Sequence, residues 1–256
     1  MALIVQNLCF AYAKRAVLHD VSLNAGNGEI VAIIGPNGSG KTTLVKCLVG
    51  LTTARQGTVL LDSRDIHRMS IIERAKAIAY VPQRVEVAGM SVFDFVLLGR
   101  RPHISWDVPA SDLELTGNII EYMGLKDLSF RNTDEISGGE FQIAQIARAL
   151  VQSPRLIALD EPTSNLDIQN QRKVMLQIRS IVKKHGVMAI MTNHDINLSI
   201  RYCDRFILLK DGKIHASGSH EIITPRNIKA VYGLDVYVGS INGFPVVVPL
   251  EEETHA

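Results

Sequence analysis

The chain contains a glycine-rich segment whose residue types and spacing suit the binding of phosphate groups. Residues 35–43 read Gly-Pro-Asn-Gly-Ser-Gly-Lys-Thr-Thr, between an apolar run at 30–34 and a helical pattern that begins at Lys41. Glycines lack a Cβ, so backbone N–H groups can converge on phosphate oxygens at the positive end of a helix. Lys41 is expected to reach the β- and γ-phosphates, and the Thr42 hydroxyl to bind Mg²⁺. We therefore predict that a nucleoside triphosphate is held by Gly35, Pro36, Asn37, Gly38, Ser39, Gly40, Lys41, Thr42 and Thr43.

Two neighbouring acids follow a second apolar run, at residues 156–159. Asp160, at the carboxyl end of this predicted strand, is placed to hold Mg²⁺ near Thr42, directly or through water. Glu161 would then lie next to the γ-phosphate and could polarise an attacking water. The alternative interpretation is that the two acids form a solvated acidic turn. The phosphate loop in the same chain favours the metal-binding and catalytic roles.

A second possible anion site lies at residues 136–142, which read Ile-Ser-Gly-Gly-Glu-Phe-Gln and lead into a helical pattern. Because one nucleotide does not need two such helix starts on one chain, Ser137, Gly138, Gly139 and Glu140 could serve a nucleotide held by another copy. A head-to-tail dimer would then close around ATP. The alternative is a capped helix start, with Ser137 as N-cap and Glu140 completing a capping box.

The pattern of elements around these motifs predicts an α/β fold. Strand-like runs and helical patterns alternate at both ends of the chain, as in a parallel sheet covered by helices. Residues 84–153 show helices and loops, which predicts a helical subdomain inserted into a nucleotide-binding core of residues 1–83 and 154–220. Gly212 marks a hairpin. Residues 221–256 are expected to form a C-terminal appendage, with short strands between 230 and 249.

Composition excludes several classes of protein. The formal net charge is +1, so no basic field favours nucleic acid. The three cysteines have no metal-binding or paired spacing, which predicts reduced packing residues in a cytosolic protein. No apolar stretch approaches the length of a spanning helix, and the N-terminus lacks the pattern of a signal peptide.

Taken together, these motifs resemble the ATPase subunits of ABC transporters, over essentially residues 1–245. Residues 136–142 look like the signature motif of that family, upstream of the two acids as the family requires. Four single residues match in order as well: Tyr12 resembles the aromatic residue that stacks on adenine, Gln83 the glutamine that senses Mg²⁺ and the membrane partner, Asp167 a residue of the loop that crosses the dimer interface, and His194 the switch histidine. Each of these four residues has an alternative interpretation when it is considered alone. Tyr12 could be a strand aromatic, Gln83 a turn residue, Asp167 a helix cap and His194 a histidine without a role.

The resemblance implies a P-loop NTPase sheet core with N-terminal antiparallel β strands and an inserted helical subdomain. It also implies catalysis of ATP hydrolysis by Glu161, His194 and Gln83, with Mg²⁺ held by Thr42, Gln83 and Asp160. The expected partners are a second copy of the chain, integral-membrane permease subunits and, indirectly, a substrate-binding protein. The expected location is the cytoplasmic face of the membrane, as a peripheral subunit. Two departures are Ile136, where the family usually shows Leu, and Ile143, where many relatives carry Arg.

Three further segments resemble the importers of iron–siderophore complexes, haem and cobalamin. They are residues 96–103 with Trp106, residues 232–236 and residues 243–245. A polar helix end with basic residues is the alternative for the first of them. Importers of zinc or manganese share much of the pattern, and a soluble ABC ATPase without a transport role is a further alternative. A plain P-loop kinase or GTPase would leave Ser137–Glu140 and His194 unexplained.

Overall fold

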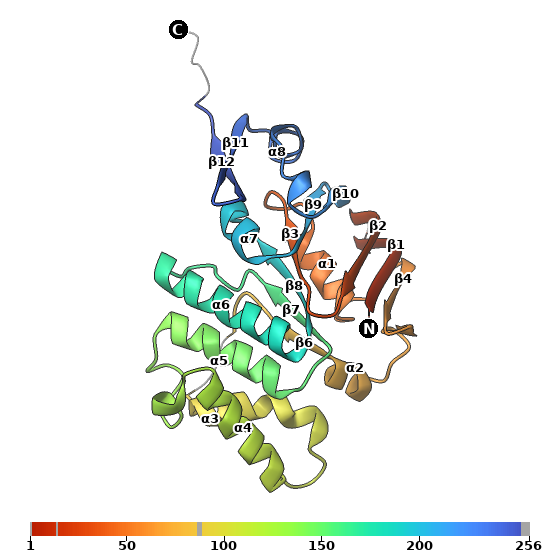
Figure 1. The fold of residues 1–256 in the computed structure, drawn as a ribbon. Helices are drawn as coiled ribbons and strands as arrows, with labels where there is room; N and C mark the ends of the chain where they lie inside the picture. Colours follow the sequence, from red (N-terminus) through yellow and green to blue (C-terminus); the bar gives the residue numbers. More distant parts are fainter. Residues whose placement is uncertain (1, 14, 86–88, 252–256) are drawn as a thin grey trace.

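The computed structural model describes residues 2–13, 15–85 and 89–251 of the 256. Its centre is a six-stranded mixed sheet in the order β10-β9-β3-β8-β7-β6 (Figure 1). Five strands run parallel, and β10 joins the edge antiparallel to β9. The strands are β3 (Ile30–Ile34), β6 (Ile78–Val81), β7 (Leu156–Asp160), β8 (Met188–Asn193), β9 (Arg205–Lys210) and β10 (Lys213–Gly218).

Two smaller sheets flank this centre. A four-stranded antiparallel sheet has the order β2-β1-β4-β5, and β11 and β12 form a hairpin near the C-terminus. Their bounds are β1 (Ala2–Tyr12), β2 (Arg15–Gly26), β4 (Gln56–Leu61), β5 (Arg64–Asp65), β11 (Val236–Ile241) and β12 (Phe244–Pro249). The helices are α1 (Lys41–Leu48), α2 (Ile71–Ala77), α3 (Val92–Leu97), α4 (Ala110–Tyr122), α5 (Gly138–Val151), α6 (Ile168–His185), α7 (Ile196–Tyr202) and α8 (Pro225–Tyr232).

The central strands are apolar on both faces because each face packs on a different layer. In β3, Val31 and Ile33 face a core shared with α1 and the four-stranded sheet. Ile30, Ala32 and Ile34 face a second core shared with the helices. Figure 1 shows α5 and α6 on one side of the sheet and α1 with β1, β2 and β4 on the other. This burial on both faces explains the continuous apolar runs in the sequence.

The segment between β6 and β7 is helical, as expected. Its helices α3, α4 and α5 pack on one another, and Phe95, Ile120 and Ile146 from these helices are almost completely buried. In the described part of this segment, the β-type pairing is a single bridge between Ser91 and Asn132. The core of this segment is continuous with the core between the central sheet and the helices. Helix α5 contributes to both parts and so connects the helical segment to the strands. The α/β fold with N-terminal antiparallel strands is confirmed, whereas the boundaries at 84 and 153 stay predictions.

The structure adds several details to the sequence prediction. The six-stranded sheet is mixed, because the hairpin at Gly212 turns β10 back along β9. The helix that begins at Lys41 ends at Leu48, and Gly50 follows with a φ of 71°. The predicted appendage 221–256 contains α8 as well as the hairpin. The signals for α8 were present: Thr224 caps it, Pro225 is its first residue and Gly233 ends it in a left-handed conformation.

No helix in the described residues is both long and apolar enough to cross a membrane.

The helical segment contains a buried ion pair. Arg100 donates to Asp112 Oδ1 over 2.9 Å, and these side chains are only 12% and 8% exposed. Arg100 also donates to the carbonyl of Val151, at the end of α5. One guanidinium therefore ties the turn after α3 to both α4 and α5.

We expect Asp112→Ala to lower the free energy of unfolding by about 3 kcal/mol, because it leaves a buried guanidinium without its carboxylate. The control is Glu121→Ala, which breaks the exposed pair with Lys126, whose side chain is 69% exposed, and should cost less than about 1 kcal/mol. Urea unfolding followed by circular dichroism compares the two variants. Equal losses would contradict this assignment of the Arg100 pair.

Candidate nucleotide-binding site

The candidate residues come together because four parallel strands end at one edge of the sheet. The phosphate loop follows β3, His194 follows β8, Asp160 and Glu161 lie at the end of β7, and Gln83 follows β6. These strands are neighbours in the order β3-β8-β7-β6. Carboxyl ends of parallel strands form the crevice in which α/β proteins hold ligands.

The phosphate loop adopts a conformation that depends on its glycines. Gly38 and Gly40 have positive φ angles of 79° and 102°, and Gly40 directly precedes α1. A Cβ on Gly35 would lie 2.1 Å from the carbonyl oxygen of Leu209 in β9. The buried Ser39 hydroxyl has no hydrogen-bond partner among the described residues. The loop therefore forms a cradle of backbone amides at a helix N-terminus, together with the unpaired hydroxyl of Ser39. This arrangement fits a phosphate group.

Lys41 lies within this cradle and is only 6% exposed. Its Nζ donates to the carbonyl oxygens of Gly35 at 2.8 Å and Pro36 at 3.0 Å. Burial lowers the pKa of Lys41, and the nearby carboxylates of Glu161 and Asp160 oppose that shift. A desolvated ammonium between two acids and a ring of amides is well placed to bind an anionic oxygen.

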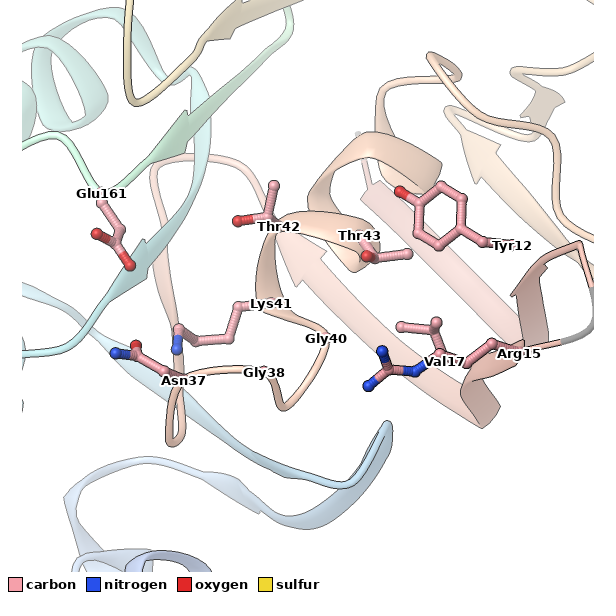
Figure 2. Close-up of a pocket in the computed structure, with 10 residues that line it drawn as sticks. All are labelled: Tyr12, Arg15, Val17, Asn37, Gly38, Gly40, Lys41, Thr42, Thr43 and Glu161. Atoms are coloured by element: carbon pink, nitrogen blue, oxygen red, sulfur yellow. The ribbon is translucent and has the colours of Figure 1, made fainter.

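A pocket of about 300 Å³ opens over the loop (Figure 2). Tyr12, 48% exposed at the end of β1, lies at one end, and Glu161 at the other. Phe10 packs edge-on against Tyr12 with ring centroids 4.7 Å apart. Sequence reasoning missed Arg15, which pairs with Tyr12 across the β1–β2 hairpin and lines the same end. The full lining is Tyr12, Arg15, Val17, Asn37, Gly38, Gly40, Lys41, Thr42, Thr43 and Glu161.

Asp160 lies in a network of hydroxyl groups. Its Oδ1 accepts from Thr42 Oγ1 at 3.1 Å and from Thr192 Oγ1 at 2.7 Å. Its Oδ2 accepts from the Tyr80 hydroxyl at 3.4 Å, and burial together with the Asp160 charge raises the pKa of Tyr80. Thr192 also accepts from the backbone N–H of Glu161 at 2.9 Å, so one buried hydroxyl positions both acids. Sequence reasoning missed Thr192, because nothing in its neighbourhood marks it.

Glu161 gathers the other two predicted catalytic residues. Gln83 Nε2 donates to Glu161 Oε2 at 2.6 Å, and His194 Nδ1 lies 3.8 Å from the same oxygen. The Glu161 backbone has a φ of 50°, which is uncommon for a residue with a side chain. This conformation turns the chain sharply after β7. The structure therefore brings Glu161, Gln83 and His194 together at the end of the pocket.

The oxygens of this site suit Mg²⁺. Among the described residues, no group of three or more His, Cys, Asp or Glu side chains could hold a metal ion alone. Thr42 and Asp160 place a hydroxyl and a carboxylate oxygen 3.1 Å apart beside the cradle, a pattern that fits a cation completed by water and phosphate oxygens. Gln83 contacts Glu161 rather than either of these residues, so its predicted contact with the metal stays a prediction.

The predicted signature residues do not line the described pocket. Ser137 caps α5 and forms a reciprocal capping box with Glu140, which holds the pKa of Glu140 below its usual value. Asp167 caps α6 and also accepts from the side chain of Asn170 at 2.9 Å. A Cβ on Gly139 would lie 2.7 Å from Asn170. Asn170 therefore connects the signature residues to Asp167.

The two departures from the family pattern are both accommodated by packing. Ile143 is 1% exposed in the core that β3 shares with the helices, and Ile136 packs against the same core. An arginine at 143 would need a buried partner for its charge. An aliphatic side chain removes that need.

The cradle accepts anionic oxygens, and the adjacent strand ends supply oxygens for a cation. Together with the fold, this arrangement defines a nucleotide-binding protein of the P-loop class. The chain belongs to the ABC transporter family, because that family's model matches residues 18–164, more than half of the 256 residues.

Individual relatives agree with this assignment. An uncharacterized ABC transporter ATP-binding protein of Methanocaldococcus jannaschii is 48% identical and covers 98% of both chains. The hemin import ATP-binding protein HmuV of Gloeobacter violaceus is 36% identical over 93% of this chain and 90% of its own length. The cobalamin import ATP-binding protein BtuD of Halobacterium salinarum is 33% identical over 100% of this chain, which spans 65% of that relative.

Solved structures give the same result. An inward-facing transporter described as metal-chelate type has a TM-score of 0.86 and 29% identity, over 98% of this chain and 97% of that chain. A dimeric ATP-binding cassette in a post-hydrolysis state, bound to ADP and Pi, has a TM-score of 0.74 and 25% identity, over 85% of this chain and 98% of that chain.

We expect Thr192→Val to lower the free energy of unfolding by about 2 kcal/mol, because the Glu161 amide loses its acceptor and Asp160 Oδ1 keeps only the bond from Thr42. Thr192→Ser keeps the hydroxyl and should restore most of this stability. Thermal unfolding of the two variants distinguishes the lost hydrogen bonds from the lost methyl group. Equal destabilisation by Ser and Val would contradict the role given to the hydroxyl.

Proposed function

We propose that this chain is the ATP-hydrolysing subunit of an importer. The observation that carries the proposal is the position of Glu161, which lines the phosphate pocket while Gln83 and His194 contact its carboxylate. A carboxylate there can accept a proton from a water aligned with the γ-phosphate. Two findings support ATP as the nucleotide: the match to the ABC transporter family, and the similarity to a dimeric ATP-binding cassette bound to ADP and Pi.

Each part of the site has a distinct role in this proposal. Tyr12 stacks on the adenine ring, and the loop amides with Lys41 hold the phosphates. Thr42 and Asp160 would hold Mg²⁺, which neutralises phosphate charge when bound. Gln83 orients Glu161 and takes part in metal binding as the site fills. His194 donates to the γ-phosphate oxygens and steadies the charge that develops there.

The working unit in this proposal is a homodimer. The signature residues lie outside the pocket of their own chain, so they are available to a second copy. Ser137 Oγ already accepts from the Glu140 N–H at 3.3 Å, and its own O–H proton remains available for a phosphate oxygen. The exposed Gly138 and the start of α5 add backbone donors. The dimeric cassette bound to ADP and Pi supports this arrangement.

The cargo we propose is a metal chelate: an iron–siderophore complex, haem or cobalamin. The support is similarity to relatives named for hemin and cobalamin import and to a transporter described as metal-chelate type. The dimer would act at the cytoplasmic face of the membrane, beneath permease subunits that receive cargo from a substrate-binding protein. Coupling would pass through the region beside Gln83 and the helical segment.

We expect Glu161→Gln to retain ATP binding while turnover falls at least a hundredfold, because the amide cannot accept a proton from water. The bound ATP should then persist and give an ATP-dependent dimer. Phosphate release measures the first effect and size-exclusion chromatography the second. Glu114→Gln, an exposed change on α4, is the control. Turnover near the wild-type rate in the Glu161 variant would refute the assigned role.

We expect Ser137→Arg to leave ATP binding by the single chain intact and to abolish ATP-dependent dimerisation, because a long cation would fill the surface that faces the second copy. Nucleotide binding is measured by fluorescence titration, and dimerisation by light scattering in the Glu161→Gln background. Ser111→Arg, at the exposed start of α4, controls for the added charge. A fully active Ser137→Arg homodimer would show that these residues do not meet a partner.

A further inference from the structure

The C-terminal hairpin lies outside the nucleotide pocket, yet it is attached to the helix that follows His194. Strands β11 and β12 meet at Asn242 and Gly243, whose φ angles of 51° and 80° suit a tight two-residue turn. This turn fixes the register, in which Val247 lies opposite Val238. Figure 1 shows β12 beside α7, and the two elements pack together. The hairpin therefore covers one side of α7.

One side chain of α7 pairs with the backbone of β12. Asn197 Nδ2 donates to the carbonyl oxygen of Val247 at 3.0 Å, and Asn197 Oδ1 accepts from the N–H of Val247 at 2.9 Å. Val247 is only 6% exposed, so its backbone groups need partners within the protein. A carboxamide offers a donor and an acceptor side by side, as a peptide group does. Asn197 thus takes the place of a neighbouring strand at the outer edge of the hairpin.

The C-terminal segment makes two further contacts with the same helix. The guanidinium of Arg201, one turn after Asn197, lies over the Phe244 ring at 4.4 Å from its centroid. A ring nitrogen of His220 lies 3.0 Å from the carbonyl oxygen of Ile200, near the end of α7. A helix of seven residues has little stability of its own. The position of α7 therefore depends on these contacts with the segment that follows it in the chain.

The start of α7 determines where His194 lies. Asp195 caps the helix by accepting from the N–H of Leu198 at 2.9 Å, and its own N–H donates to Asn193 Oδ1 at 3.1 Å. Both neighbours of His194 are thus held by hydrogen bonds. The His194 side chain itself is 55% exposed and lies 3.8 Å from Glu161 Oε2. Its direction is therefore set by the turn between β8 and α7, and this turn moves with the helix.

We propose that Asn197 is a positioning residue for His194, and that the C-terminal hairpin, through Asn197, holds α7 where the His194 imidazole can reach the γ-phosphate. The inference rests on the proposed function, since it requires a nucleotide beside His194. Without the paired hydrogen bonds, α7 keeps its cap but loses its fixed position against β12, and the imidazole is in place for a smaller fraction of the time. Turnover then falls, whereas nucleotide binding by the phosphate loop does not.

The first test compares Asn197→Ala, which removes both hydrogen bonds, with Asn118→Ala, the same change at an exposed position of α4. Single-turnover hydrolysis is measured with protein in excess over ATP, so that slow variants remain measurable. For Asn197→Ala we expect a rate about fivefold lower and a Kd for a fluorescent ATP analogue within about twofold of the wild type. In the His194→Ala background the same change should have almost no further effect on the rate, because the group that Asn197 positions is absent. Asn118→Ala should match the wild type.

The second test does not depend on catalysis. Nuclear magnetic resonance of carbon-13-labelled histidine rings reports on His194, whose signal is assigned by its loss in His194→Ala. We expect Asn197→Ala to shift or broaden this signal in the free protein, while His215, exposed on β10, keeps its signal. Asn197→Asp retains an acceptor for the Val247 N–H and loses the donor. It should change the rate and the signal in the same direction, and it replaces Asn197→Ala if that variant does not fold.

The His194→Ala variant separates failure of this inference from failure of the proposed function. No hydrolysis by the wild type, or full turnover by His194→Ala, contradicts the proposed function, and the inference falls with it. If His194→Ala is slow but Asn197→Ala hydrolyses ATP at the wild-type rate, the positioning role alone is overturned. The same conclusion follows if the Asn197 change slows both backgrounds by an equal factor, or if it leaves the His194 signal unchanged.

Discussion

The parallel pairing of β3 with β8, and of β8 with β7, is the constraint on which the site depends. Thr42 and Asp160 are 118 residues apart in the sequence, yet their side chains share a hydrogen bond. This contact exists because Asp160 ends β7 and Thr42 follows β3 and its loop, and the carboxyl ends of these strands lie at one edge. The continuous apolar runs that build these strands fix the edge, since burial on both faces leaves the strands no other packing. Polar chemistry at the edge is thus supported by an apolar interior.

Buried polar groups then set the geometry within that edge. The Thr192 hydroxyl donates to Asp160 and accepts from the Glu161 amide, which fixes the orientation of both acids. Glu161 holds a positive φ, a conformation that persists when its surroundings determine it fully. Preorganised groups need little rearrangement when charge develops at a phosphate. The backbone cradle and Lys41 contribute in the same way on the other side of the pocket.

The signature segment shows that a local role and a functional role can belong to the same residues. Ser137 and Glu140 form the capping box that an isolated helix start would use, and Asp167 caps α6 in the ordinary manner. These bonds satisfy N–H groups at the helix ends. They also leave the Ser137 proton and the exposed end of α5 available to another chain. The plain interpretation of the pattern is therefore correct and does not exclude the proposed one.

The sequence alone determined the fold class, the family and the phosphate loop, because each depends on local residue types: glycines where a Cβ cannot fit, apolar runs for buried strands, and acids at strand ends. Tertiary structure decided what depends on distant partners. Thr192 gained its role only from the β7–β8 pairing, and Arg15 only from the β1–β2 hairpin that places it beside Tyr12. A single threonine or arginine carries no local signal of such contacts, since its neighbours in space are far away in the chain.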